Sequence, residues 1–180
     1  MLEDERNLIT EAKGGEAEAF GRLYDYYLPM IYRFILLKVG HREEAEDLTH
    51  QVFLKAWQNM SNYSEKGFPF SSWLYRIAKN SIIDHYRRAK PSTNIDDLVN
   101  IEELISRPDI GKIDEKEELA KIMKSIGKLK ETEKDVIIMR FVEDLSVKEV
   151  SDALNKSEGA VKVIQHRAIK KLQELLQKDN

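Results

Sequence analysis

Apolar residues recur at spacings of three and four over residues 3 to 89, as a helix with one buried face requires. The clearest such face consists of Phe20, Leu23, Tyr27, Ile31, Phe34 and Ile35. Pro29 lies inside this helix, where a proline removes a backbone hydrogen bond, so we expect it to kink or divide the helix. No alternating strand pattern competes with the helical one. The first half of the chain is therefore predicted to be all-helical.

Two more helices are predicted before residue 91. One spans about Glu43 to Met60 and buries a stripe made of Ala45, Leu48, Val52 and Ala56. The other begins after Ser71, a residue type suited to the N-cap, and turns one side toward the core, namely Trp73, Ile77, Ala78 and Ser81. Together these helices predict a small N-terminal domain over residues 1–90.

From Pro91 to Asp114 the pattern becomes irregular and acidic, in the stretch PSTNIDDLVNIEELISRPDIGKID. We interpret residues 91–114 as an acidic linker, with one helical turn around Ile101 to Ile105. A solvated tether accounts for this composition. Helical periodicity resumes at Leu119, Ile122, Met123, Ile126 and Leu129. A second helical domain is therefore predicted over residues 115–180.

Capping motifs mark three helix starts in this second domain. Thr132 with Asp135 resembles a capping box, and Ser146 with Glu149 is a full Ser-x-x-Glu box. Ser157 marks the third start. The predicted helices run from about Glu133 to Val142, Val147 to Leu154, and Glu158 to Leu176. The turn Asn155-Lys156-Ser157 between the last two has the spacing of a helix-turn-helix.

Composition and charge narrow the class of protein. The chain has 180 residues, 42% of them hydrophobic, which is enough for one ordinary domain or two small ones. It has no cysteine, which excludes disulfides and thiolate metal sites and suits a reducing cytoplasm. No signal peptide or transmembrane helix is evident, so we expect a cytoplasmic protein without membrane insertion. The net charge of -3 hides local basic surfaces, because the carboxylates concentrate between Asp96 and Glu118.

The last predicted helix has a basic side. Its buried side would hold Val161, Ile164, Ala168, Leu172 and Leu175, leaving Lys162, His166, Arg167, Lys170 and Lys171 to solvent. Such cations neutralise phosphates, and backbone N–H groups at the helix start around Ser157 bind one more. The alternative is a solvated basic face, which the helix dipole favours near any C-terminus.

A second surface is predicted on the helix from Glu43 to Met60. Away from the buried stripe, this helix presents an acid, polar groups and large apolar groups, namely Asp47, His50, Gln51, Leu54 and Trp57. Such a mixture suits a surface that docks another helix. A half-buried core tryptophan is the equally weighted alternative.

A third surface combines the loop NYSEKGFPF with the helix after it. The loop supplies aromatic rings and a lysine, which suit unpaired bases and their backbone. On the helix, Arg76, Asn80 and Arg87 share one stripe, with Lys79 and Arg88 alongside. We therefore expect one side of this helix to pack in the core and another side to bind nucleic acid.

Taken in order, EEAEDLTHQVFLKAW, FSSWLYRIAKNSIIDHYRR, the acidic linker and LSVKEVSDALNKSEGAVKVIQHRAIKKL resemble an extracytoplasmic function, or group IV, sigma factor of the sigma-70 family. The resemblance covers nearly the whole chain. It implies an all-α fold of two small helical domains, sigma-2-like and sigma-4-like. It also implies binding to core RNA polymerase, through its β′ and β subunits, and to promoter DNA.

The resemblance assigns residues to three roles. The polymerase-binding segment corresponds to Asp47, Leu48, His50, Gln51, Leu54 and Trp57. The segment that captures and opens the -10 element corresponds to Asn62, Tyr63, Ser64, Lys66, Trp73, Arg76, Lys79, Asn80, Arg87 and Arg88. The reader of the -35 duplex corresponds to Arg140, Ser157, Lys162, Val163, His166, Arg167 and Lys170. The linker would thread the polymerase interior near the template strand, where its acidity would mimic nucleic acid.

The sequence departs from the family pattern at two places. His50-Gln51 stands where the family commonly has Gln-Glu, and Val163-Ile164-Gln165 replaces Ser-Arg-Leu. The first change alters one β′ contact. The second replaces a polar group and a cation with apolar groups, so the family's -35 specificity does not carry over directly, and Val163 instead suits a thymine methyl group.

Two other classes of function were weighed. A stand-alone helix-turn-helix regulator would bind duplex DNA without polymerase. An enzyme has little support, because the four histidines are scattered and no phosphate-binding or metalloprotease motif is present. We expect no catalytic residue, no metal and no cofactor. By analogy with the family, an anti-sigma factor is an expected partner.

Overall fold

The structure, a computed structural model, describes residues 2, 4–64, 68–88 and 121–178. The chain divides into two compact units, Met1–Asp97 and Leu98–Asn180. All regular secondary structure in the described ranges is helical, which confirms the predicted all-α class. The predicted linker over 91–114, including the turn at Ile101 to Ile105, lies outside the described residues.

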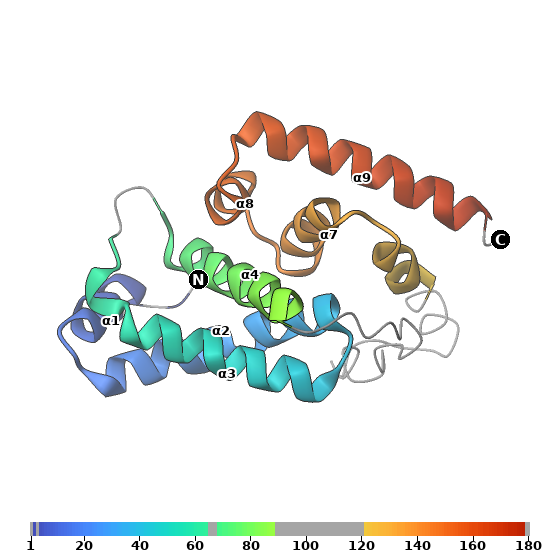
Figure 1. The fold of residues 1–180 in the computed structure, drawn as a ribbon. Coiled ribbons are helices and arrows are strands. Elements are labelled where there is room, and N and C mark those ends of the chain that lie inside the picture. Colours follow the sequence, from blue (N-terminus) through green and yellow to red (C-terminus); the bar gives the residue numbers. More distant parts are fainter. Residues whose placement is uncertain (1, 3, 65–67, 89–120, 179–180) are drawn as a thin grey trace, which may run out of the picture. The chain divides into compact units, whose positions relative to one another are not determined.

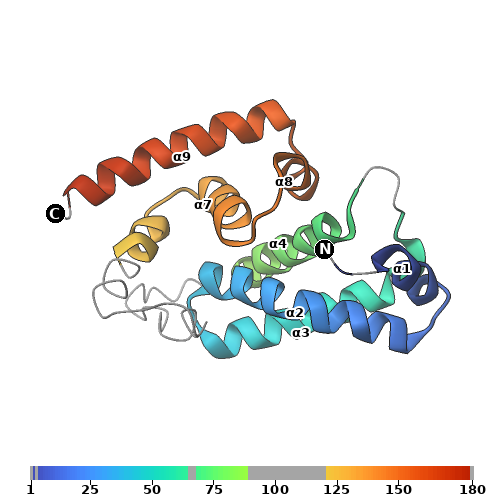
Figure 2. The same cartoon turned by 180° about the vertical axis from the view of Figure 1, so that it is seen from behind.

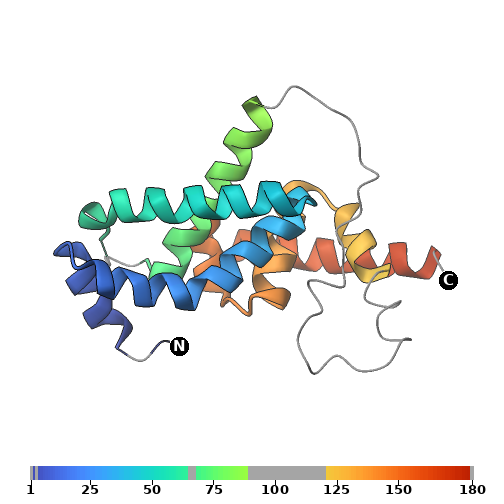
Figure 3. The same cartoon turned by 90° about the horizontal axis from the view of Figure 1, so that it is seen from below.

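The N-terminal unit is built around one long helix. Its elements are α1 (Glu5–Lys13), α2 (Ala17–Val39), α3 (Arg42–Gln58), the short 3-10 helix η1 (Met60–Asn62) and α4 (Phe70–Arg88) (Figure 1). Helix α2 packs against α1, α3 and α4. Seen from below, α2 and α3 run side by side and α4 crosses them (Figure 3). This arrangement leaves one side of α3 and one side of α4 outside the core.

The core of this unit follows the predicted apolar faces. Every residue of the predicted α2 stripe is buried, from Phe20 to Ile35. Helix α2 continues through Pro29, so the expected division of the helix does not occur. It ends at Gly40, whose φ of 80° is left-handed and whose N–H donates to the Leu36 carbonyl at 2.9 Å. A glycine adopts this helix-ending conformation without a steric penalty.

The C-terminal unit consists of a helical segment over 121–127, α7 (Glu131–Ile137), the π-helical turn η2 (Ile138–Val142), α8 (Val147–Leu154) and α9 (Glu158–Lys178). Helix α9 packs on both α7 and α8, and Figure 2 shows it running across them. The core between these helices contains Val136, Ile138, Met139, Val150, Val161 and Ala168. Burial of these residues fixes the orientation of α9 about its axis.

The helix-turn-helix prediction is confirmed in its local chemistry. Ser146 Oγ accepts from the Glu149 N–H at 3.1 Å, and Glu149 Oε2 accepts from the Ser146 N–H at 2.8 Å. Asn155 ends α8 in the left-handed region with a φ of 51°, a conformation that asparagine tolerates. Ser157 Oγ then accepts from the Ala160 N–H at 3.2 Å, which caps α9.

Two predicted caps are wrong. Helix α4 begins at Phe70, so Ser71 lies inside the helix, where it is buried. Helix α7 begins at Glu131 with Lys130 as its N-cap residue, and Glu133 Oε2 accepts from the Lys130 N–H at 3.0 Å. Thr132 is therefore not the cap. In both cases the helix starts earlier than its first capping-type residue.

Candidate functional site

The α3 face is defined here as Asp47, His50, Gln51, Leu54 and Trp57. The first four side chains are exposed, and Leu54, a large apolar residue, is 47% exposed. Trp57 is half-buried because its ring packs against Phe20, with 4.9 Å between the ring centroids. Leu48 is only 2% exposed, so its expected surface role is not supported and it is a core residue.

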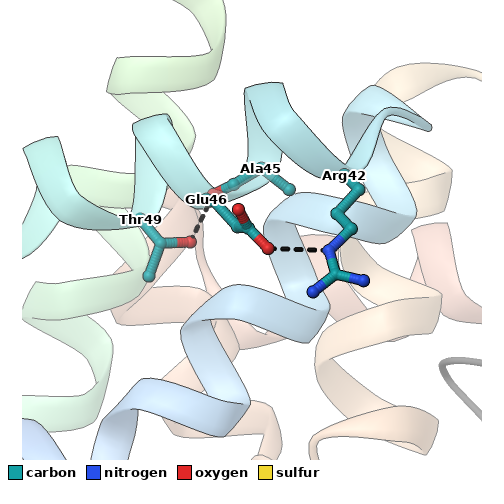
Figure 4. Close-up of polar contacts among 4 residues, drawn as sticks. All are labelled: Arg42, Ala45, Glu46 and Thr49. Atoms are coloured by element: carbon teal, nitrogen blue, oxygen red, sulfur yellow. Dashed lines mark hydrogen bonds and ion pairs between the residues drawn. The ribbon is translucent and has the colours of Figure 1, made fainter.

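Helix α3 is stabilised by bonds that do not involve the α3 face (Figure 4). Arg42 Nε donates to Glu46 Oε1 at 2.8 Å, one turn apart along the helix. The buried Thr49 hydroxyl donates to the Ala45 carbonyl at 2.6 Å, which satisfies its polar group within the helix. No side-chain hydrogen bond or ion pair joins Asp47, His50 or Gln51 to any other described residue. Their side chains are therefore available to a partner.

An apolar groove of about 270 Å³ borders the α3 face. Helix α2 contributes Phe20 and Tyr24 to it, and α3 contributes His50, Leu54 and Trp57. The sequence analysis missed the two α2 residues, because their spacing is that of ordinary core positions. The α3 face is thus continuous with a groove that accepts apolar side chains.

The loop between η1 and α4 is closed by a hydrogen bond. Tyr63 Oη donates to the Phe68 carbonyl at 2.8 Å. Tyr63 is 4% exposed and its ring contacts those of Phe70 and Trp73, so it anchors the loop and does not lie open to a base. Ser64 is exposed, and Lys66 lies outside the described residues.

Phe68 is the exposed aromatic residue of the described part of this loop. It is 42% exposed, and the Arg76 guanidinium lies 5.0 Å from its ring centroid, within the range of a cation–π interaction. The sequence analysis did not single out Phe68. Composition alone could not separate it from Tyr63 and Phe70, because all three are aromatic and only the fold buries two of them.

The α4 face is defined here as Trp73, Arg76, Asn80 and Arg87. These positions are spaced by three, four and seven residues, which places them on one side of a helix. Of the predicted core side, Ala78 and Ser81 are buried, whereas Trp73 and Ile77 are half-buried; the Trp73 ring packs against those of the buried Tyr63 and Phe70. Asn80 is exposed, and Arg76 is half-buried.

The remaining cations of α4 differ in their surroundings. Arg87 Nη2 lies 3.1 Å from Asp84 Oδ1, and its side chain is 75% exposed. Arg88 is exposed and Lys79 is half-buried. The structure therefore places Arg76 beside Phe68 in the N-terminal half of α4, with Asn80 one turn further on, whereas Arg87 and Arg88 lie at the C-terminal end of the helix.

Helix α9 exposes the residues predicted for duplex DNA. Ser157, Lys162, Val163, His166, Arg167 and Lys170 are all exposed, and Val163 is 50% exposed. Lys171 differs, because its Nζ lies 3.6 Å from Glu133 Oε2. The first turns of α9 thus combine free cations with one exposed apolar side chain.

Arg140 occupies a different position from the other predicted DNA contacts. It is half-buried, and its guanidinium donates to the Leu145 carbonyl and, at 3.3 Å, to Gln165 Oε1 of α9. These bonds link the turn before α8 to the middle of α9. Arg140 therefore positions α9.

Two searches of the described ranges give negative results. No group of three or more histidine, aspartate or glutamate side chains there is arranged to hold a metal ion. No helix in the described part of the chain is both long and apolar enough to span a bilayer.

Comparisons with known proteins identify the family. The family model for Sigma-70 region 2 matches residues 23–92, and the family model for Sigma-70, region 4 matches residues 125–174. The chain is 32% identical over 177 residues to the ECF RNA polymerase sigma factor SigW of Bacillus subtilis, covering 93% of this chain and 94% of that protein. It is 33% identical over 174 residues to the ECF RNA polymerase sigma factor BldN of Streptomyces coelicolor, covering 96% of this chain but only 66% of that protein.

Solved structures show the same fold. CnrH, in complex with the cytosolic domain of CnrY, matches with a TM-score of 0.72 at 26% identity, over 98% of this chain and 99% of that one. RpoE, in complex with the anti-sigma factor NepR from Bartonella quintana, matches with a TM-score of 0.67 at 22% identity, over 89% and 98%. The chain therefore belongs to the sigma-70 family and, within it, to the extracytoplasmic function (ECF) group of RNA polymerase sigma factors. The predicted family and function are confirmed at this level.

Proposed function

We propose that the three exposed surfaces divide the work of promoter recognition. The α3 face binds the β′ subunit of core RNA polymerase. Leu54 supports this role, because an apolar side chain surrounded by polar ones and bordered by a groove is typical of a docking helix. Trp57 and Phe20 hold the groove wall in place through their ring contact.

The end of α4 and the loop before it are proposed to capture the -10 element. One observation carries this proposal: an exposed ring, Phe68, packs beside the Arg76 guanidinium next to Asn80. Stacking and a nearby positive charge are what an unpaired base and its backbone require. Binding of the unpaired strand offsets a few kcal/mol of unstacking, so no ATP is needed.

Helix α9 is proposed to enter the major groove of the -35 duplex. Lys162, Arg167 and Lys170 supply phosphate contacts, which give most of the affinity but little specificity. Val163 is proposed to meet a thymine methyl group, because it is apolar and half exposed near the start of the helix. Ser157 and His166 complete this surface.

Other properties follow from the same proposal. The domain limits remain 1–90 and 115–180, with the acidic linker between them entering the polymerase. The chain acts in the cytoplasm and catalyses no reaction by itself. CnrH and RpoE were each solved with a bound partner, named as an anti-sigma factor in the second case. We propose that an anti-sigma factor likewise binds this chain and covers its polymerase-binding surfaces.

The test is transcription from a random promoter pool with core polymerase and the full chain. Selection of promoters that share paired -35 and -10 elements is the expected result, and it would also report the bases that Val163 favours. A stand-alone regulator is the alternative. If the chain ignores polymerase and selects duplex DNA alone, the roles given to the α3 and α4 faces are wrong.

A further inference from the structure

A polar pocket of about 300 Å³ lies between α3 and α4, separate from the apolar groove. From α3 it is lined by Gln51 and Lys55 above the aliphatic Leu48. From α4 it is lined by Ser81, His85 and Arg88, with Asp84 at its side. Gln51 also belongs to the α3 face and Arg88 to the predicted -10 contacts, but no role described above uses the pocket itself.

The charges around the pocket do not cancel. Asp84 pairs with Arg87 at 3.1 Å, and Glu44 pairs with His85, with 3.2 Å between Oε2 and Nε2. Both neighbouring carboxylates are therefore engaged. Lys55 and Arg88 have no carboxylate partner within 4 Å among the described residues, so the pocket retains positive charge.

Lys55 is the unusual member of this set. Its side chain is half-buried, and its ammonium group donates to the hydroxyl of Ser81 at 2.9 Å. An ammonium group has three donors, and a half-buried cation with one neutral partner is poorly compensated. The position one turn before Lys55 is Gln51, an amide, where a carboxylate would have formed an i,i+4 ion pair.

We propose that the α3–α4 pocket binds a phosphate group. Lysine ammonium and arginine guanidinium groups are the side chains that bind phosphate oxygens most strongly, and Gln51 and Ser81 add neutral polar contacts. The pocket is large enough for the phosphate group and part of the molecule that carries it. A bound phosphate would bridge the helix of the α3 face to the helix of the α4 face. Its source is either a free phosphate compound or the DNA backbone.

The first experiment is a titration of the isotope-labelled full chain with inorganic phosphate, followed by NMR at constant ionic strength. We expect saturable shifts at Lys55, Ser81 and His85. The Lys55→Met variant should bind at least about tenfold more weakly, because a hydrogen bond to a charged group is lost. Lys13→Gln, at an exposed position of α1, is the matched control and should bind as the unchanged protein does.

A second variant distinguishes a loss of phosphate binding from an effect of Lys55→Met on folding. Arg88 is exposed, so Arg88→Gln should leave the thermal unfolding midpoint unchanged while it weakens phosphate binding. The proposal is wrong if chloride at equal ionic strength produces the same shifts. It is also wrong if neither variant changes the phosphate affinity.

The source of the phosphate is distinguished by competition. If a short DNA duplex displaces inorganic phosphate from the pocket, and Lys55→Met weakens both, the ligand is a backbone phosphate. If DNA binds without displacing phosphate, the ligand is a free phosphate compound. Both results support a phosphate site and leave the proposed promoter contacts to be tested by their own variants.

Discussion

The contribution of α9 to DNA binding can be measured through its dependence on salt. Lys162 and Arg167 are exposed cations on the side of α9 that faces away from its core contacts. Each phosphate neutralised by a protein cation adds about 0.9 to the slope of log affinity against log salt concentration. Lys162→Gln combined with Arg167→Gln should therefore reduce that slope by about 1.8. Between about 50 and 200 mM salt, the variant should lose about 12-fold less affinity than the unchanged protein.

The assay is promoter binding by the reconstituted holoenzyme, with DNA taken from the random-pool selection. Contacts made by the polymerase add equally to both slopes and cancel in the difference. Lys171→Gln is the matched control, because Lys171 already pairs with Glu133 at 3.6 Å and its side chain is 37% exposed. It should leave the slope nearly unchanged. Equal slopes for the double variant and the unchanged protein would refute the role given to α9, as would a large change with Lys171→Gln.

Three further predictions concern the other surfaces. Leu54→Asp should weaken core polymerase binding by roughly 2 kcal/mol in a pull-down titration. The circular dichroism melting curve of this variant should stay unchanged because Leu54 is exposed. A lower melting temperature would instead show that Leu54 is a core residue. Phe68→Ala should make open-complex formation less favourable by about 1 to 3 kcal/mol per stacked base, as measured by permanganate reactivity. An equal loss of polymerase affinity would contradict the role given to Phe68. Ser146→Ala should lower the stability of α8 by about 1 kcal/mol in amide hydrogen exchange, because the Glu149 N–H loses its acceptor, Ser146 Oγ. Unchanged exchange would show that this bond contributes nothing.

The helices and their buried faces were predictable from sequence because helical periodicity is a local property. The stripe from Phe20 to Ile35 is buried throughout, and the Ser146 box caps α8 as its spacing predicts. The start of α4 was not predictable in this way. Phe70 packs on Tyr27, 43 positions away in the sequence, with 5.5 Å between the ring centroids. This contact favours an earlier helix start than the capping-type residue Ser71 indicates.

The candidate site was predictable in its helices and less so in its individual side chains. Residue type gave no means to tell the anchoring Tyr63 from the exposed Phe68, because burial depends on packing against Phe70 and Trp73. Arg140 reads as a DNA contact in sequence because it is basic and precedes the helix-turn-helix. Its hydrogen bond to Gln165, 25 positions later, is a tertiary contact and gives it a structural role.

The hydrogen bond from Tyr63 to the Phe68 carbonyl joins the buried anchor of the loop to the residue that carries its exposed ring. The anchor uses a buried ring and a backbone oxygen, so it does not depend on the side chain of Phe68. The hydrogen bond holds Tyr63 and Phe68 at a set separation before any DNA arrives, which lowers the entropy lost on binding. The exposed ring of Phe68 therefore extends from a backbone position that is already held in place.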